Sequence, residues 1–130
     1  MPGLPVNPEG LVPPRGFSHG MRGQGEYLFV AGQIGWDQQG RLVGEDFVAQ
    51  FAKALDNVLV VVREAGGGPS SLVRLAIYLT DRREYQERTR ELGIAYRERM
   101  GKHYPAMTLL EVKALLEEGA KVELEAVALL

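Results

Sequence analysis

Apolar residues recur with the period of a helix between residues 47 and 62. The stripe follows the spacing i, i+4, i+8, i+11, i+12 and i+15 and consists of Phe47, Phe51, Leu55, Val58, Leu59 and Val62. This spacing predicts an amphipathic helix whose stripe packs into a core. Asp46 is placed to cap the first turn, because its carboxylate accepts hydrogen bonds from amides that lack helical partners. The glycine run at residues 66–68 predicts the end of the helix, since glycine adopts the left-handed conformation common there.

The N-terminal part predicts an extended segment followed by a hairpin. Five of the seven prolines lie within residues 2–16, and proline fits neither a helix interior nor a central strand. We therefore expect residues 1–15 to form an extended, proline-rich lead-in. Residues 17–21 and 27–33 flank a glycine-rich, turn-like stretch at 22–25, which predicts a β-hairpin. The second arm is apolar on both faces, so it is expected to be covered from both sides.

A second helix is predicted after residue 80. Asp81 and Glu84 have the spacing of a capping box, in which each side chain accepts a hydrogen bond from the backbone amide of the other residue. The helix is expected to run to about Met100, and Gly101 suits its end. Three of its side chains are expected to point inward: Tyr85, Leu92 and Tyr96. Gly93 weakens the helix by about 1 kcal/mol relative to alanine.

Three further strands complete the expected order. A strand over residues 71–79 places one set of side chains on one face: Val73, Leu75, Ile77 and Leu79. Residues 106–112 and 120–129 predict the last two strands. The order strand-strand-helix-strand-helix-strand-strand favours an α+β fold in which two helices pack on one face of a mixed sheet. A chain of this length favours one domain, over residues 1–130.

The sheet face without helices is expected to be an interface, because two helices of this length cover only one face. This face is expected to carry a mixed set of side chains: Arg74, Ala76, Tyr78, Glu123, Glu125 and Val127, with Met107 and Leu109 joining them. The set is too apolar for open solvent, which indicates contact with another chain. A buried carboxylate needs a partner or takes up a proton. Arg74 is the expected partner of Glu123 and Glu125, and a structural ion pair is the alternative to a functional carboxylate.

The composition narrows the possible chemistry. Without cysteine, the chain forms no disulfide, no catalytic thiolate and no cysteine-bound metal site. No apolar run is long enough for a membrane span and no secretory signal is recognised, so a cytoplasmic protein is expected. The net charge is −2, and the arginines between residues 82 and 90 are interleaved with glutamates. This pattern indicates a solvated helix face rather than a nucleic-acid site.

Four motifs resemble segments of a known family. They are Gly32-Gln33-Ile34 after an apolar strand, the Gln50 to Val58 helix segment, Tyr104-Pro105-Ala106, and Val122 to Ala128. In order and with similar spacing, they resemble the RidA (YjgF) family over about residues 16–129. The resemblance implies a chorismate-mutase-like sheet with two helices on one face, a homotrimer, and ligand clefts between subunits. It also implies hydrolysis of reactive imines and enamines, derived from amino acids, to 2-oxo acids and ammonia without a cofactor.

The family's site carries over to this chain only in part. Glu123 matches the glutamate that handles the attacking water, and Gly32 matches the glycine beside the ligand. Met107 stands where the family has the arginine that grips the substrate carboxylate, Phe17 replaces a tyrosine, and Ala31 replaces a serine. The lost charged hydrogen bond is worth about 1.5–3 kcal/mol. The chain therefore resembles a divergent member whose cleft prefers less anionic or more apolar ligands.

Another cation could replace the missing arginine. Arg90 is one candidate, because it lies near the family's second-helix position that faces the cleft. Arg15 and His19 are others, while Arg74 more readily pairs with an acid. His19 and His103 do not have the spacing of metal ligands, so no metal site is predicted.

Two functional hypotheses from different classes follow. The apolar replacements favour a non-catalytic binding or regulatory trimer whose cleft holds a small metabolite between Phe17, Ala31 and Met107. The alternative is an active 2-iminobutanoate/2-iminopropanoate-type deaminase with relocated carboxylate recognition, in which Glu123 activates water. The usual activity on small amino-acid-derived imines is not expected. A third hypothesis, an endoribonuclease or translation inhibitor, is disfavoured by the acidic charge balance and the lack of an obvious catalytic set.

Overall fold

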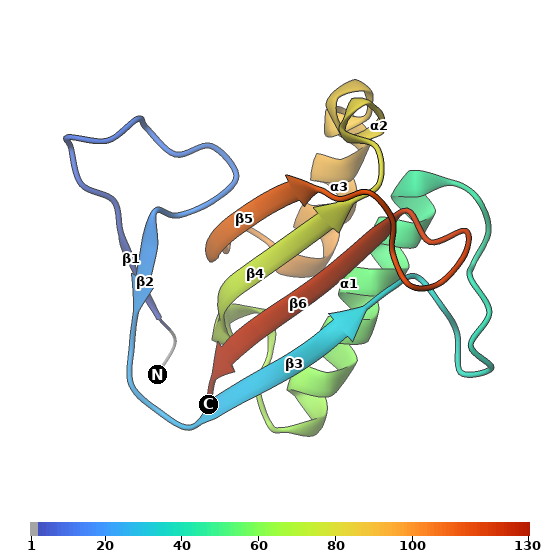
Figure 1. The fold of residues 1–130 in the computed structure, drawn as a ribbon. Helices are drawn as coiled ribbons and strands as arrows, with labels where there is room; N and C mark the ends of the chain where they lie inside the picture. Colours follow the sequence, from blue (N-terminus) through green and yellow to red (C-terminus); the bar gives the residue numbers. More distant parts are fainter. Residues whose placement is uncertain (1–2) are drawn as a thin grey trace.

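A mixed four-stranded sheet with helices on one face forms the centre of the computed structural model, which describes residues 3–130 (Figure 1). The strands lie in the order β3 (Tyr27–Gln33), β6 (Val122–Leu129), β4 (Leu72–Leu79) and β5 (Ala106–Glu111). β6 runs antiparallel to both of its neighbours, whereas β4 and β5 are parallel. This arrangement confirms the expected α+β fold with a mixed sheet.

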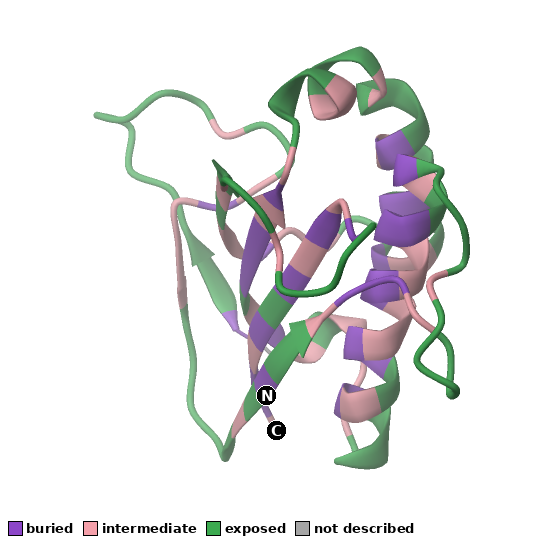
Figure 2. Cartoon of the chain, turned by 45° about the vertical axis from the view of Figure 1, so that its right-hand side comes forward, coloured by how far each residue is buried: buried purple, intermediate pink, exposed green. Residues whose placement is uncertain are grey.

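The first long helix, α1 (Phe47–Glu64), confirms the helix predicted from the apolar stripe. Asp46 Oδ2 accepts a hydrogen bond of 2.9 Å from the Ala49 amide and so caps the first turn. Every residue of the stripe is buried on the side that faces the sheet (Figure 2). Gly66 has a φ of +94°, which ends the helix as the glycine run predicts. Among the described residues, no helix has both the length and the apolar character needed to cross a membrane.

The second helix is not continuous, so the prediction of one helix up to residue 100 was wrong. α2 (Arg82–Glu87) and α3 (Thr89–Met100) are separated at Arg88, and a short 3-10 turn, η1 (Pro69–Ser71), precedes β4. The Arg88 guanidinium bonds to Asp46 at 3.2 Å and to Glu91 at 2.6 Å. It thereby ties the break between the two helices to the start of α1. The hydrogen bond from Arg88 also lowers the pKa of Glu91 below its ordinary value.

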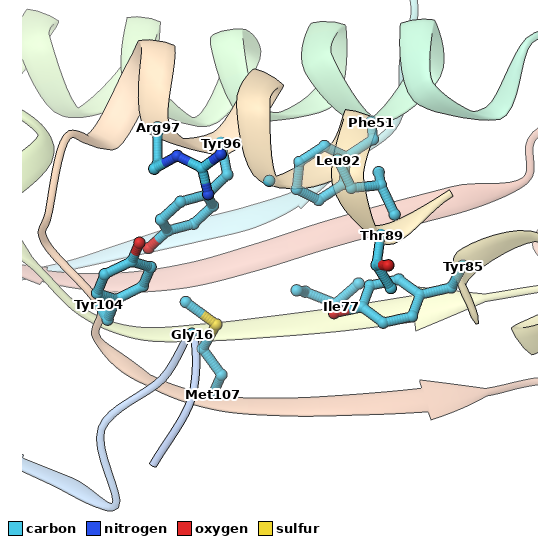
Figure 3. Close-up of a pocket in the computed structure, with 11 residues that line it drawn as sticks. Gly16, Phe51, Ile77, Tyr85, Thr89, Leu92, Tyr96, Arg97, Tyr104 and Met107 are labelled. Carbon is cyan, nitrogen blue, oxygen red and sulfur yellow. The ribbon is translucent and has the colours of Figure 1, made fainter. Parts of the chain in front are cut away.

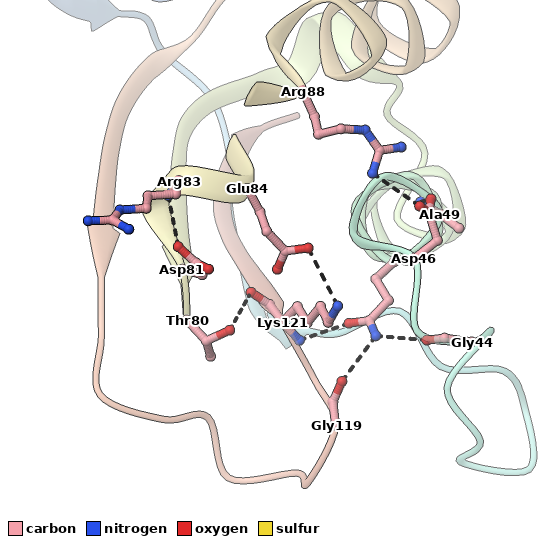
Figure 4. Close-up of polar contacts among 11 residues, drawn as sticks. Gly44, Asp46, Ala49, Thr80, Asp81, Arg83, Glu84, Arg88, Gly119 and Lys121 are labelled. Carbon is pink, nitrogen blue, oxygen red and sulfur yellow. Dashed lines mark hydrogen bonds and ion pairs between the residues drawn. The ribbon is translucent and has the colours of Figure 1, made fainter. Parts of the chain in front are cut away.

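Asp81 caps α2, but the predicted capping box is only half formed (Figure 4). Asp81 Oδ1 accepts a hydrogen bond of 2.9 Å from the Arg83 amide. The Glu84 carboxylate instead pairs with the Lys121 ammonium, with 3.5 Å between Oε2 and Nζ. A charged partner binds a carboxylate more strongly than a neutral amide does, which explains why Glu84 turns away from Asp81.

The predicted N-terminal hairpin does not form. β1 (Leu4–Val6) and β2 (Gly20–Arg22) make a separate antiparallel pair, while β3 pairs with β6. Gly25 has a φ of +140° and passes so close to the Leu130 backbone that a side chain would collide with it. Next to it, Glu26 and Leu130 exchange backbone hydrogen bonds of 3.1 and 2.9 Å. The glycine therefore permits a close passage beside the end of β6 rather than a tight turn.

The N-terminal segment, residues 3–23, lies beside the start of β5 (blue in Figure 1). The Ser18 amide donates a hydrogen bond of 3.1 Å to the Pro105 carbonyl, and its hydroxyl donates one of 2.6 Å to the Tyr104 carbonyl. Within the segment, a ring nitrogen of His19 hydrogen-bonds to a backbone carbonyl at 2.7 Å. The expected extended lead-in is thus part of a folded segment, which is fixed at the edge of the sheet.

The helix-side face of β4 differs from the prediction at one position. Val73 lies at an irregularity in the pairing with β6, close to Gly3 of the N-terminal segment, and is only half-buried. Leu72 takes its place in the core and is fully buried. The other predicted core residues of this strand are buried: Leu75, Ile77 and Leu79.

Two side chains of β5 also lie on the opposite face from the one expected. Met107 and Leu109 pack against the helix-side core. The parallel register explains this, because it sets Thr108 beside Ala76, so residues 106, 108 and 110 share the open face with Ala76. The expectation that Met107 and Leu109 join the open face was therefore wrong.

The open face leaves two aromatic side chains of β3 in solvent. Tyr27 is 68% exposed and Phe29 is 75% exposed. Phe29 lies opposite Val127, which in turn lies opposite Arg74, so these side chains form one row across the sheet. Among residues 3–130, β3 is covered on its helix side only, so the expectation of cover on both sides is not met within this chain.

Candidate functional site

Glu123 and Gly32 lie against each other on the open face of the sheet. A register shift between Val30 and Gln33 brings Gly32 beside β6. A side-chain carbon on Gly32 would collide with Glu123 Oε2 and lie 2.9 Å from Glu123 Cδ. The carboxylate thus occupies the space that the missing side chain leaves, and Ala31 beside it is exposed. Three residues that the sequence assigned to one site are together here.

A buried glutamine fixes the start of the strand that carries Glu123. Gln50 of α1 is fully buried, and its side-chain nitrogen donates to the carbonyls of Gly44 at 2.8 Å and Gly119 at 3.1 Å. Its side-chain oxygen accepts a hydrogen bond of 2.8 Å from the Lys121 amide. These three backbone groups converge on the start of α1 (Figure 4). Because Lys121 is two residues before Glu123, the helix sets the position of the carboxylate.

Asn57 of α1 fixes the end of β3 in the same way, through hydrogen bonds to the backbone. The side-chain nitrogen of Asn57 donates to the carbonyls of Ile34 and Trp36, at 3.0 Å each. These residues follow Gly32 directly along the chain. Gln50 and Asn57 both belong to the helix motif that resembles the family, and their contacts explain why polar side chains occur there. They hold the two strand ends at which Gly32 and Glu123 meet.

The expected ion pair between Arg74 and the glutamates is not formed among the described residues. Arg74 lies opposite Val127, whereas Tyr78 lies opposite Glu123 and two residues from Ala76, the position opposite Glu125. The Tyr78 hydroxyl donates a hydrogen bond to the Glu125 carboxylate, which raises the pKa of Tyr78. Arg74 Nη2 instead donates to a threonine hydroxyl of β5 at 3.2 Å. The register of β4 against β6 therefore keeps the arginine away from the carboxylates.

A cavity of about 270 Å³ opens on the other side of the sheet, between α3 and β5 (Figure 3). It is lined by Gly16, Phe51, Ile77, Tyr85, Thr89, Leu92, Gly93, Tyr96, Arg97, Tyr104 and Met107. The sulfur of Met107 lies in the β5 wall near Gly16 of the N-terminal segment. Tyr96 and Tyr104 stack with their ring centroids 5.3 Å apart. The cavity is therefore mostly aromatic and aliphatic.

The cation in this cavity is Arg97 and not Arg90. Arg90 is exposed on α3 and lies outside the lining. The lining positions of α3 are spaced by three or four residues and form one helix face: Thr89, Leu92, Gly93, Tyr96 and Arg97. Sequence reasoning missed Arg97, although it directly follows Tyr96, which was expected to point inward. The apolar spacing of this helix was the signal that could have found it.

The remaining candidates from the sequence lie near the cavity or have structural roles. Phe17 follows Gly16 and packs edge-on against the His19 ring, with centroids 5.1 Å apart. Arg15 is exposed. A ring nitrogen of His103 hydrogen-bonds to a backbone carbonyl of β4 at 2.7 Å. Both histidines are therefore engaged with the backbone.

The predicted site residues occupy two surfaces of one chain. Glu123 and Gly32 lie on the open face, whereas Met107 faces the helices on the other side of the sheet. The cavity that Met107 lines does not include Glu123. One chain alone therefore does not join the two halves of the site expected from the sequence.

Comparisons with known proteins identify the family. The family described as Endoribonuclease L-PSP matches residues 9–130. A RutC family protein of Pyrococcus abyssi is 30% identical over 105 residues, which cover 80% of this chain and 79% of that protein. The 2-iminobutanoate/2-iminopropanoate deaminase of Salmonella typhimurium is 29% identical over 107 residues, which cover 80% of each protein.

A solved structure extends the similarity to the N-terminal segment. YyfB of Yersinia pestis, a protein of unknown function of the conserved Rid protein family, is 32% identical to this chain with a TM-score of 0.89. The match covers 100% of both chains, so it includes the segment that packs beside β5. The chain therefore belongs to the Endoribonuclease L-PSP family, which is the RidA/YjgF family.

Proposed function

We propose that this chain is a divergent family member that binds a small metabolite in a cleft between the subunits of a homotrimer. The observation that carries this proposal is the apolar side chain of Met107 in the wall of the cavity between α3 and β5. The resemblance to the family places a carboxylate-binding arginine at this position, and a thioether forms no ion pair. The usual activity on small amino-acid-derived imines depends on that arginine and is not the function of this chain.

The distribution of the site residues supports a cleft between subunits. Glu123 and Met107 lie on opposite faces of the sheet in one chain. They can share one cleft when the open face of one copy meets the β5 side of another. The exposed aromatic rings of Tyr27 and Phe29 supply apolar surface for such a contact.

Met107→Arg is expected to create an activity that the unmodified protein lacks. An amino-acid oxidase generates imines from small aliphatic amino acids, and their disappearance is followed with each protein. The unmodified protein is expected to leave the rate unchanged, whereas the variant accelerates it by about 10- to 150-fold, because a charged hydrogen bond contributes about 1.5–3 kcal/mol. Met107→Leu is the matched control and is expected to stay inactive. Strong acceleration by the unmodified protein would contradict the proposal.

A second candidate function, hydrolysis of a bulkier imine, is favoured by the contact between Gly32 and Glu123. A carboxylate held at a fixed position can activate water or transfer protons. The name of the Salmonella typhimurium relative supports the same chemistry for this chain. In this candidate function Glu123 is the general base, and the missing side chain of Gly32 leaves room for its carboxylate.

On imines generated from phenylalanine and tryptophan, Glu123→Gln is expected to lower the rate by about 100-fold or more, since general acid–base catalysis contributes ~10²–10⁴-fold. Gly32→Ala is expected to cause a similar loss, because its side chain displaces the carboxylate. Glu125→Gln, on the same strand, serves as the control and is expected to keep the rate. A full rate in Glu123→Gln rules out this candidate function.

A further inference from the structure

We propose that Arg97 is the anion-binding residue of the cavity between α3 and β5, and that this cavity takes a compact aromatic monocarboxylate. The inference rests on the proposed function, because it requires this cavity to be the ligand site, and it replaces the expectation of a less anionic ligand with that of an anion held from α3 instead of from residue 107. It assigns the recognition of the carboxylate to a residue of α3, eight positions along the helix from Thr89 at the other end of the lining face.

The size and walls of the cavity indicate the body of the ligand. The volume of about 270 Å³ is at the lower end of the ~300–1,000 Å³ of small-molecule pockets. It indicates a small ligand, such as one aromatic ring with a short substituent. The walls offer aromatic faces from Phe51, Tyr85 and Tyr96, with which a flat ring packs favourably. The thioether of Met107 adds a polarisable contact for the ring.

The Arg97 guanidinium has no anion to bind within residues 3–130. Its side chain makes no ion pair or hydrogen bond there, whereas Arg88 and Arg99, at the two ends of the same helix, both pair with carboxylates. A guanidinium binds a carboxylate through two parallel N–H donors, which fixes orientation as well as position. Arg97 is exposed at the cavity, so its charge stays hydrated until a ligand enters.

The absence of a side chain at Gly93 leaves room for the Arg97 guanidinium. Gly93 lies one turn before Arg97 on α3, and a side-chain carbon there would be only 2.9 Å from Arg97 Nη1. Glycine in the middle of a helix is unfavourable, so its presence at this position needs a reason. The missing side chain lets the arginine fold back along the helix toward the cavity, whose lining includes both residues.

The charge of the lining limits the ligand to one anionic group. Arg97 is the single cation among the lining residues, and none of them is acidic. The hydroxyls of Tyr85, Thr89 and Tyr104 also line the cavity and make no side-chain hydrogen bond among the described residues. Tyr104 lies at the same end of the cavity as Arg97, so its hydroxyl is the one available to the same carboxylate, whereas Tyr85 and Thr89 lie at the other end (Figure 3). A single guanidinium with one neutral hydroxyl matches a monocarboxylate better than a phosphate dianion.

The test compares two ligands of the same shape that differ in charge. Phenylacetate and phenylacetamide are titrated into the unmodified protein, and dissociation constants are measured from NMR chemical shifts. Phenylacetate is expected to bind about 2- to 5-fold more tightly, because Arg97 is exposed and water screens an exposed ion pair. In Arg97→Gln this preference is expected to disappear, while Arg90→Gln, two turns earlier on α3 and outside the cavity lining, is expected to retain it.

Gly93→Ala separates ligand binding from stability. The alanine is expected to raise the melting temperature, because it favours the helix, and at the same time to weaken phenylacetate binding by displacing the guanidinium. Equal affinity for the acid and the amide, unchanged in Arg97→Gln, would overturn the role of Arg97 and leave the proposed cavity intact. If neither compound shifts the signals of cavity residues, both this inference and the proposed ligand site are wrong.

Discussion

Phe29→Glu is expected to convert an assembled protein into a monomer. Phe29 is 75% exposed in one chain, on the open-face side of the edge strand β3, so an assembly that covers this part of the face buries it in every copy. Each buried phenylalanine stabilises the assembly by about 1.5–3 kcal/mol. A glutamate at the same position loses this contribution and adds the cost of removing a charge from water. In the proposed trimer, each of the three chains therefore loses the burial of its phenylalanine and has to remove a glutamate charge from water.

The measurement is the mass in solution by light scattering or sedimentation. Three chains of 14.3 kDa give about 43 kDa for the unmodified protein, and the variant is expected at the mass of one chain. Val60→Glu is the matched control, because Val60 is 62% exposed on α1, away from the open face. That variant is expected to keep the larger mass. An unmodified protein with the mass of one chain at all concentrations would reject the proposed trimer.

Gln50→Leu is expected to have the largest effect on stability. The substitution keeps a buried side chain of similar size but leaves two carbonyls and one amide of the chain without their partner. Gly44 and Gly119 are exposed, so water can reach their carbonyls, while the Lys121 amide is half-buried. The free energy of unfolding is therefore expected to fall by about 1–3 kcal/mol, the cost of one unpaired buried group, out of the ~5–15 kcal/mol that stabilises an ordinary domain.

Urea unfolding, followed by circular dichroism, measures this change. Gln38→Leu is the control, since Gln38 is exposed in the loop after β3 and a surface change is expected to stay within about 0.5 kcal/mol. A loss below about 1 kcal/mol in Gln50→Leu would mean that other groups replace its hydrogen bonds. Because Gln50 holds the turn before Glu123, a folded variant is also expected to lose the position of that carboxylate.

The sequence predicts the parts of the fold in which a periodic pattern coincides with local capping. The stripe from Phe47 to Val62 reports burial directly, and Asp46 and Gly66 set the ends of the helix within the same segment. Such signals need no knowledge of distant residues. The sides of β6 were predicted for the same reason, since Val122, Leu124, Ala126 and Ala128 are buried, whereas Glu123, Glu125 and Val127 are not.

The errors arise where distant residues decide the local structure. Gly25 resembles a turn residue in the sequence, but the structure uses it to pass the Leu130 backbone, more than a hundred positions along the chain. The break at Arg88 depends on its contact with Asp46, which belongs to another helix. Neither partner can be identified from periodicity, and both were missed for this reason.

The candidate site was also predicted only in part. The resemblance to the family named Gly32 and Glu123, and the structure places them in contact on the open face. Arg90 was considered and Arg97 was not, although the two residues are seven positions apart on α3 and therefore lie on nearly the same side of the helix, about two turns from each other. Arg97 and not Arg90 lines the cavity, and the lining combines α3 with β5. The pattern of one segment of sequence does not show which residues of two elements lie side by side.

The segment that crosses the start of β5 also affects how copies of the chain can join. A free edge strand is a template for another strand, and proteins whose edges remain open tend to form fibres. Ser18 occupies the backbone at the start of β5, and Glu111 at its end accepts a hydrogen bond from the Arg82 amide at 2.9 Å. At the opposite edge, the irregularity at Ala31 and Gly32 interrupts β3. These features shorten the free backbone at both edges, which disfavours growth by strand addition and favours association through the faces of the sheet, where a small closed ring is complete and resists fibrous aggregation.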